Sequence, residues 1–227
     1  QEALFEKVHA GWLGEIIGSA LGTAVEGFKS SRIWEVFGEI TEYVKPPETL
    51  NDDITFELAL LEAFREKGYD ITSEDIADKW VGYIPFAYTA EEIALNHLRH
   101  GIYPPESGYV ANPYREMIGA AMRAAICGAL APANPRMAAE LAWRDGCVSH
   151  HNNGILAEVF NALIVSMAYV ETDMQVILDK AMRMIPRDSE FYSVLAFACQ
   201  ACGQSRDYRQ AWELCEEKYK EYNWVHA

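Results

Sequence analysis

Three groups of polar residues in this chain have types and spacing that could do chemistry, and the first is Asn51-Asp52-Asp53. Adjacent carboxylates raise each other's pKa unless a cation or hydrogen-bond donors offset the repulsion, and Mg²⁺ prefers a few carboxylates together with water. The same residues also suit the start of a helix, because Asn caps helices and Asp in the first turn interacts favourably with the helix dipole. From the spacing alone, metal binding and helix capping both stay open.

The second and third groups are a single glutamate and a run of polar residues. Glu26 follows a glycine-rich stretch at the expected end of a helix, where a carboxylate opposes the helix dipole. That placement indicates a use for the side chain, although a solvated loop carboxylate is the commoner case. The run Ser149-His150-His151-Asn152-Asn153-Gly154 lies between two helical stretches. A histidine there can bind a phosphate, a hydroxyl or a metal, or can be part of a helix cap or the surface.

Helices must position these groups, because apolar residues recur at helical spacing along most of the chain and rarely alternate with polar ones. Short connections predict an all-α fold, a single compact multi-helix domain over residues 1–227. A loop is expected at 101–113, and the small residues of 114–130 predict a central, tightly packed segment. Helices are expected at about 2–21, 52–66, from 73, 89–99 with Thr89 as the cap, 134–145, 154–170, 174–185, 189–202 and 207–222.

Charge, hydropathy, motifs and cysteine spacing each argue against particular classes of protein. The chain has 19 basic and 34 acidic residues, a net charge of −15, which argues against a general nucleic-acid or anionic-membrane surface. No stretch approaches the 18 apolar residues of a membrane span, and the motifs of P-loop, Rossmann, zincin and α/β-hydrolase proteins are absent. The five scattered cysteines do not form a disulfide pattern, which favours reduced thiols and a cytoplasmic location.

The three groups, taken in this order, resemble the ADP-ribosylglycohydrolase family. The resemblance covers most of the chain and rests on the order and spacing of several short segments rather than on any one motif. These segments are Gly11-Trp-Leu-Gly14, Gly18-Ser-Ala-Leu-Gly22-Thr-Ala-Val-Glu26, Asn51-Asp52-Asp53-Ile54-Thr55 with Glu57-Leu58-Ala59, Gly119-Ala-Ala-Met-Arg123, and 138–145 leading to Ser149-His150.

The resemblance implies an all-α protein that binds two Mg²⁺ ions, or Mn²⁺ in some members, and hydrolyses the glycosidic bond of an ADP-ribosyl or related ribosyl group. The substrate would be an ADP-ribosylated protein or a small ribosyl compound. The implied metal ligands are Asn51, Asp52, Asp53 and Glu26. Glu26 and Asp53 are also the implied catalytic carboxylates. The implied substrate-binding residues are Ser19, Gly119, Ala120, Arg123, His150 and Asn153, with Arg123 and the small residues on the pyrophosphate side.

The sequence departs from the family pattern in three places. Ser19 occupies a position that is acidic in many relatives, and Asn51 replaces a Thr or Ser that ligates metal. The C-terminal Asp-x-Asp-Thr-type motif that completes the metal site in the family is not found, so we expect a chain that lacks its C-terminal metal-binding segment. These departures favour an alternative, in which the protein binds an ADP-ribose-like ligand with little or no turnover. The oligomeric state is not predicted.

Overall fold

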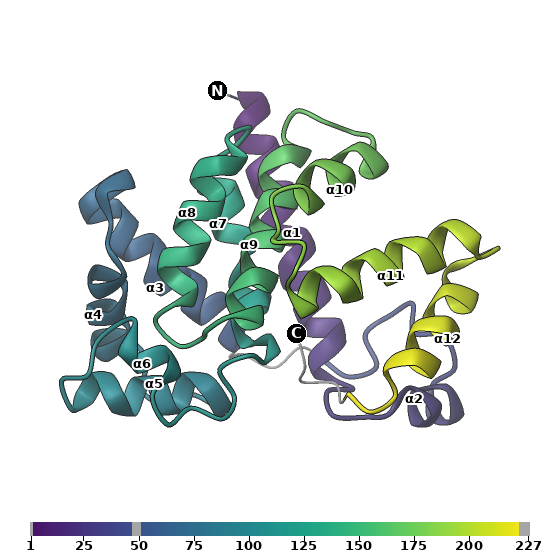
Figure 1. Ribbon diagram of the computed structural model, residues 1–227, viewed down its shortest axis with the longest axis horizontal. Coiled ribbons are helices and arrows are strands. Elements are labelled where there is room, and N and C mark those ends of the chain that lie inside the picture. Colours follow the sequence, from purple (N-terminus) through teal and green to yellow (C-terminus); the bar gives the residue numbers. More distant parts are fainter. Residues whose placement is uncertain (1, 47–50, 223–227) are drawn as a thin grey trace. The chain divides into compact units, whose positions relative to one another are not determined.

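The structure is a computed structural model that describes residues 2–46 and 51–222. Over these residues the chain forms helices joined by turns and loops, with no strand, as the sequence predicts (Figure 1). The α-helices are α1 (Glu2–Thr23), α2 (Ser30–Val36), α3 (Asp52–Lys67), α4 (Ser73–Tyr83), α5 (Thr89–Arg99), α6 (Glu106–Tyr109), α7 (Ala125–Leu130), α8 (Pro135–Gly146), α9 (Asn153–Ala168), α10 (Met174–Met182), α11 (Glu190–Gln204) and α12 (Tyr208–Tyr219). Two 3₁₀ segments are η1 (Gly68–Asp70) and η2 (Ile118–Arg123).

The chain divides into two compact units within α3. The first unit, Gln1–Leu58, holds α1, α2 and the start of α3, and the second unit, Ala59–Ala227, holds the remaining helices. The expectation of a single domain over residues 1–227 stays a prediction.

Side-chain caps explain why several helices begin where the sequence predicts. Thr72 and Asp75 form a capping box at α4, in which each side chain bonds to the other residue's backbone N–H. The Asn134 side chain accepts from the Met137 N–H, and Pro135 is the first residue of α8. Ser189 and Asp207 cap α11 and α12 in the same way.

The 114–130 segment contains a 3₁₀ turn, η2, followed by the short α7, and its small residues tolerate the tighter 3₁₀ winding in which side chains at i and i+3 eclipse. Two local expectations were wrong. Thr89 begins α5 but does not cap it; Tyr88 is the N-cap residue, with no side-chain hydrogen bond. The short helices α2 and α6 were not predicted, and α6 lies inside the expected loop.

The second unit has a core in which α9 packs against α7, α8 and η2 (Figure 1). Gly128 of α7 shows how close the approach is, since a Cβ there would lie 2.6 Å from the Val165 Cβ and 2.7 Å from the Ala162 carbonyl oxygen. Ala120 and Ala124 are fully buried. The tight packing predicted for these small residues is therefore confirmed. Within the described residues, no helix has the length and apolar character needed to cross a bilayer.

Candidate functional site

The first unit brings together five carboxyl groups, which we call the acidic cluster: Glu15 of α1, Glu26 after α1, and Asp52, Asp53 and Glu57 of α3. Among the members of the acidic cluster whose pKa is shifted, Glu26 is the most exposed. Burial raises its pKa, and the nearby charges of Asp52 and Asp53 raise it further. Glu26, Asp52 and Asp53 are therefore electrostatic neighbours, as expected for residues proposed to share one site.

Asp53 is the half-buried member of the predicted pair. The Ser19 Oγ donates to Asp53 Oδ2 over 2.6 Å, which links α1 to the start of α3. Burial raises the pKa of Asp53 and the charge of Asp52 adds to the effect, while hydrogen bonds from Ser19 and Asn51 work in the opposite direction. The Ser19 hydroxyl thus faces a predicted metal ligand.

Asn51 caps α3. Helix capping was one of the two roles, with metal binding, that the sequence left open for this residue. Its Oδ1 accepts from the Ile54 N–H over 3.4 Å, and its backbone carbonyl accepts from Thr55 Oγ1 over 2.8 Å. Both Asp52 and Asp53 lie in the first turn of α3, where the helix dipole favours negative charge. Capping and metal binding are compatible for these residues, since an Asp in the first turn still presents its carboxylate outward.

Glu15 and Glu57 belong to the cluster but were not predicted as site residues. Their carboxyl groups lie within hydrogen-bonding reach of each other, and burial together with Asp53 raises the pKa of Glu15. Glu57 is fully buried. The signal that could have found Glu57 is its spacing four residues after Asp53, which places both side chains on one face of α3.

The donor set matches a hard divalent cation in chemistry but does not form a complete metal site. Among the described residues, Glu15 Oε2 is shielded from solvent and receives no hydrogen bond, so it is free to accept from a proton or a cation. However, the ranges 2–46 and 51–222 contain no group of three or more His, Cys, Asp or Glu side chains placed to hold a metal ion. The acidic cluster is therefore a partial site as it stands.

Arg123 lies in the interior of the second unit, where its donors are directed at protein acceptors. Nε donates to Asp145 Oδ2 over 2.5 Å, Nη1 donates to Glu91 Oε1 over 2.9 Å, and Nη2 donates to Ser149 Oγ over 2.9 Å. The guanidinium also covers the ring of Trp80, with 4.9 Å from Cζ to the ring centroid. Because Arg123 is only 1% exposed, this geometry favours a structural role over the predicted phosphate contact.

Gly119 and Ala120 are buried beside Arg123. The Gly119 carbonyl accepts from Arg123 Nη1 over 3.0 Å, and a Cβ at Gly119 would lie 1.9 Å from Glu91 Oε1. Only glycine fits there, because the Glu91 carboxylate occupies the space of a side chain. The close backbone approach inferred from the small residues is real, but in this structure it is made to Glu91.

His150 is also interior, at 1% exposed. Its Nδ1 lies 2.7 Å from Ser149 Oγ, which already accepts from Arg123, so the hydroxyl hydrogen is available to Nδ1. Burial and the positive charge of Arg123 hold the pKa of His150 well below its usual range. The imidazole is therefore neutral, with Nε2 as the protonated nitrogen, 3.9 Å from Glu91 Oε1.

The segment that carries His150 is held by polar side chains of α6 and of the turn that follows it. Asn112 Nδ2 donates to the Ser149 carbonyl over 3.0 Å, and Ser107 Oγ donates to the Val148 carbonyl over 2.7 Å. Asn153, a predicted substrate-binding residue, donates from Nδ2 to Glu116 Oε2 over 2.7 Å and accepts from the Phe191 N–H over 3.1 Å. These contacts give Asn153 a positioning role at the start of α9 and α11.

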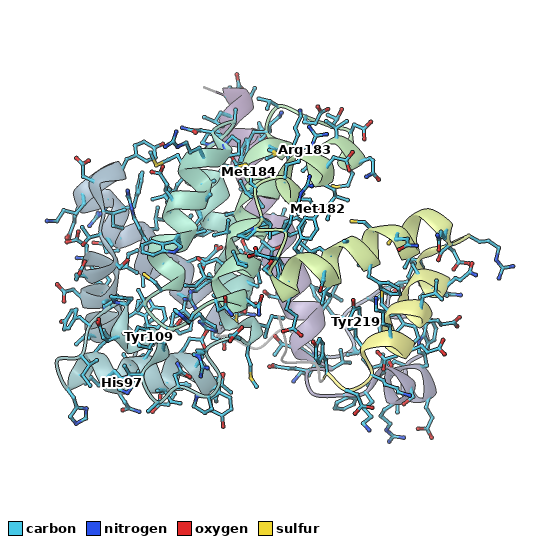
Figure 2. All side chains as sticks on the ribbon, in the orientation of Figure 1. His97, Tyr109, Met182, Arg183, Met184 and Tyr219 are labelled. Carbon is cyan, nitrogen blue, oxygen red and sulfur yellow. The ribbon has the colours of Figure 1, made fainter. Side chains whose placement is uncertain are left out.

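The cysteines form no disulfide, as expected from their spacing. Met182, labelled on α10 in Figure 2, lies with its Sδ 3.7 Å from the Cys199 Sγ of α11. Burial raises the pKa of the Cys199 thiol. Cys199 is therefore a partly buried thiol that packs against Met182.

Comparisons with known proteins decide the family. The sequence matches the ADP-ribosylglycohydrolase family over residues 1–226. The chain belongs to the ADP-ribosylglycohydrolase family. The resemblance inferred from the glycine-rich helix, the aspartate pair and the Gly119–Arg123 run is thus confirmed, and so is the all-α fold.

A solved structure supports the fold of this family member. The chain is similar to a protein of an "ADP-ribosylglycohydrolase-related protein complex", with a TM-score of 0.62 and 21% sequence identity. The match covers 94% of this chain and 81% of the other. A search of curated proteins finds no significant match. Family membership makes a glycohydrolase the coarse functional class, and the fold agrees with it.

Proposed function

We propose that this ADP-ribosylglycohydrolase family member is a metal-dependent hydrolase that cleaves the glycosidic bond of an ADP-ribosyl or related ribosyl group. The substrate is an ADP-ribosylated protein or a small ribosyl compound. The observation that carries the proposal is the acidic cluster, whose carboxylates belong to the segments that match the family. Clusters of carboxyl groups with raised pKa values are typical of functional sites.

The acidic cluster supplies the two roles that the reaction needs. Asp52, Asp53, Glu26 and the Asn51 amide oxygen are proposed to bind Mg²⁺ or Mn²⁺. A divalent cation offsets the burial and the mutual repulsion that raise the pKa values of Glu26 and Asp53. Glu26 and Asp53 are proposed to move protons at the reacting bond. A carboxyl group with a raised pKa can donate a proton to a leaving oxygen and later accept one from water.

Cation binding is tested first, by isothermal titration of Mg²⁺ and Mn²⁺ into the wild type and into the double variant Asp52→Asn, Asp53→Asn. We expect the double variant to lose divalent binding while its helix content persists, since Asn also caps helices. Glu62→Gln, on the same helix and paired with Arg65, is the matched control. Unchanged affinity in the double variant would show that the metal assignment is wrong.

Hydrolysis is tested by measuring release of ADP-ribose from ADP-ribosylated protein and from a small ADP-ribosyl compound, with Mg²⁺ and with a chelator. We expect Glu26→Gln to lower the rate by about 10²–10⁴-fold, the usual contribution of a general acid or base. Glu35→Gln is the control, because Glu35 is an exposed partner of Arg32 in the same unit. Full activity of Glu26→Gln, or full activity with the chelator, would contradict the proposal.

A second candidate function is a binding protein of the same fold that holds an ADP-ribose-like ligand without turnover. Two observations favour it: the described residues form no complete metal-ligand group, and Ser19 offers a hydroxyl where many relatives have a carboxylate. Calorimetry with ADP-ribose separates the two functions. Binding of ADP-ribose with no measurable hydrolysis of any ADP-ribosyl substrate supports the binding protein.

A further inference from the structure

The interior of the second unit holds three carboxyl groups around one guanidinium. Glu91 of α5, Asp145 of α8 and Glu158 of α9 are all 3% exposed or less, and Arg123 is their common positive neighbour. Two of the carboxylates, Glu91 and Asp145, already form ion pairs with Arg123. If all three were ionised, the buried group would carry a net charge of about −2, a large cost in a medium of low dielectric constant.

The Asp145 and Glu158 carboxyl groups lie within hydrogen-bonding reach of each other. Among the described residues, Asp145 Oδ1 and Glu158 Oε2 are shielded from solvent and have no donor. Glu158 Oε2 is also pressed against the end of α8, because a Cβ at Gly146 would lie 2.5 Å from it. Two carboxyl groups can form a hydrogen bond only when one of them holds a proton, since an ionised carboxylate is acceptor-only.

We propose that Asp145 and Glu158 share one proton in the folded protein, and that this proton is a pH-sensitive link between α8 and α9. The shared proton gives the facing carboxyl oxygens a donor and removes one negative charge from the interior. When it is lost at alkaline pH, two carboxylates repel each other between the two helices, so the fold of the second unit weakens. The link lies apart from the acidic cluster and does not depend on the proposed function.

The groups that surround the pair support this assignment. Burial and Asp145 hold the pKa of Glu158 well above its usual range, and the charge of Arg123 only partly opposes them. The titratable or charged groups that face Glu158 are Asp145 of α8, Cys147 directly after α8, Cys127 of α7, Arg123 of η2 and Glu91 of α5. The helices α10 and α11 also pack against α9, and their buried residues are the apolar Ile177, Ala181, Phe191 and Ala201. His150 is neutral, so it adds no second positive charge.

The direction of the pH dependence follows from this pair. A carboxyl group whose folded pKa is raised stabilises the fold fully below its unfolded pKa, and that stability is lost as pH rises through the folded pKa. At neutral pH the unfolded Glu158 is ionised, so unfolding releases the proton. Because the two groups titrate together, the measurement concerns the proton of the pair.

The test is proton release on unfolding at pH 7, measured by calorimetry in buffers of different ionisation enthalpy. Glu158→Gln keeps a donor for Asp145 but carries no titrating proton. We expect it to release about one proton fewer than the wild type, and to keep its melting temperature at alkaline pH where the wild type loses it. Glu140→Gln on the exposed side of α8 is the control and should match the wild type. Equal proton release by wild type and Glu158→Gln would overturn the proposal.

A measurement on the wild type covers the case in which Glu158→Gln does not fold. Side-chain carboxyl ¹³C resonances of Asp and Glu shift on ionisation. We expect the folded wild type at pH 7 to show one interior carboxyl that is still protonated and that titrates only at alkaline pH. If every interior carboxyl of the second unit has the shift of a carboxylate at pH 7, Asp145 and Glu158 do not share a proton.

Discussion

Ser19 of α1 donates its hydroxyl hydrogen to the Asp53 carboxylate of α3 across 2.6 Å. This bond connects the glycine-rich first helix with the aspartate pair that defines the acidic cluster. It also explains how a serine can occupy this position, where many members of the family have a carboxylate. A hydroxyl satisfies Asp53 without a cation, whereas a carboxylate at the same position would require one.

Replacing Ser19 with Asp should therefore strengthen cation binding. Ser19→Asp places another carboxylate beside Asp53, so the metal-free protein loses stability by about 1–2 kcal/mol and the affinity for Mg²⁺ rises. Calorimetry and urea unfolding with and without Mg²⁺ measure the two effects. Ser19→Asn is the control, because asparagine has the same shape as the introduced aspartate but carries no charge. Equal Mg²⁺ affinity in both variants would argue against a cation at this position.

Arg123→Ala should destabilise the second unit by about 3–5 kcal/mol, because it leaves Glu91 and Asp145 as buried carboxylates without their counter-ion. Urea unfolding followed by circular dichroism measures the loss. Arg136→Ala is the control, since Arg136 is an exposed partner of Glu140 and should change stability by less than about 1 kcal/mol. A stable Arg123→Ala variant with weakened ADP-ribose binding would restore the ligand role predicted from the sequence.

Gly119→Ala should unfold or strongly destabilise the protein, because the new Cβ would lie 1.9 Å from Glu91 Oε1. The loss should exceed about 2 kcal/mol, as for other forced overpacking in a core. Gly203→Ala is the matched substitution, since it adds the same methyl to α11 where nothing lies within 4 Å. That control should gain up to about 1 kcal/mol from helix propensity. Similar melting temperatures for the two variants would mean that Glu91 moves aside freely.

The protein should lose stability on the acid side through His150. Its folded pKa is well below the unfolded value of about 6.5, so the neutral ring contributes stability that is fully present above pH 6.5. That stability falls as the pH drops from 6.5 towards the folded pKa, with a slope of up to about 1.4 kcal/mol per pH unit. Urea unfolding between pH 7.5 and 5 measures it. His150→Asn, which can still accept from Ser149, should lack this part of the slope; identical slopes would mean that His150 is not buried and neutral.

Much of the fold could be predicted because its determinants are local. Helical periodicity and caps such as Asn134 and Ser189 depend on residues three or four positions apart, which a sequence displays directly. The Gly119–Arg123 segment was harder, because its closest packing partner is Glu91, 28 residues or more earlier in the chain.

The candidate site was only half predictable for the same reason. Asp52 and Asp53 are adjacent in the chain, so their mutual repulsion is visible in the sequence. The partners of Arg123 are Glu91, Asp145 and Ser149, at 22 to 32 residues from it, and no local pattern reveals them. An arginine beside small residues is equally compatible with a phosphate contact and with a buried ion pair. The structure shows buried ion pairs with Glu91 and Asp145, and the phosphate contact stays a prediction.

The hydrogen bonds of the Asn153 side-chain amide make the protein sensitive to deamidation at this residue. Its Nδ2 donates to Glu116 Oε2 over 2.7 Å, and its Oδ1 accepts from the Phe191 N–H in the first turn of α11. Deamidation to aspartate would exchange the donor for an anion facing the Glu116 carboxylate, so attraction would turn into repulsion. Hydrolysis of this one side-chain amide would therefore weaken the contacts at the start of both α9 and α11.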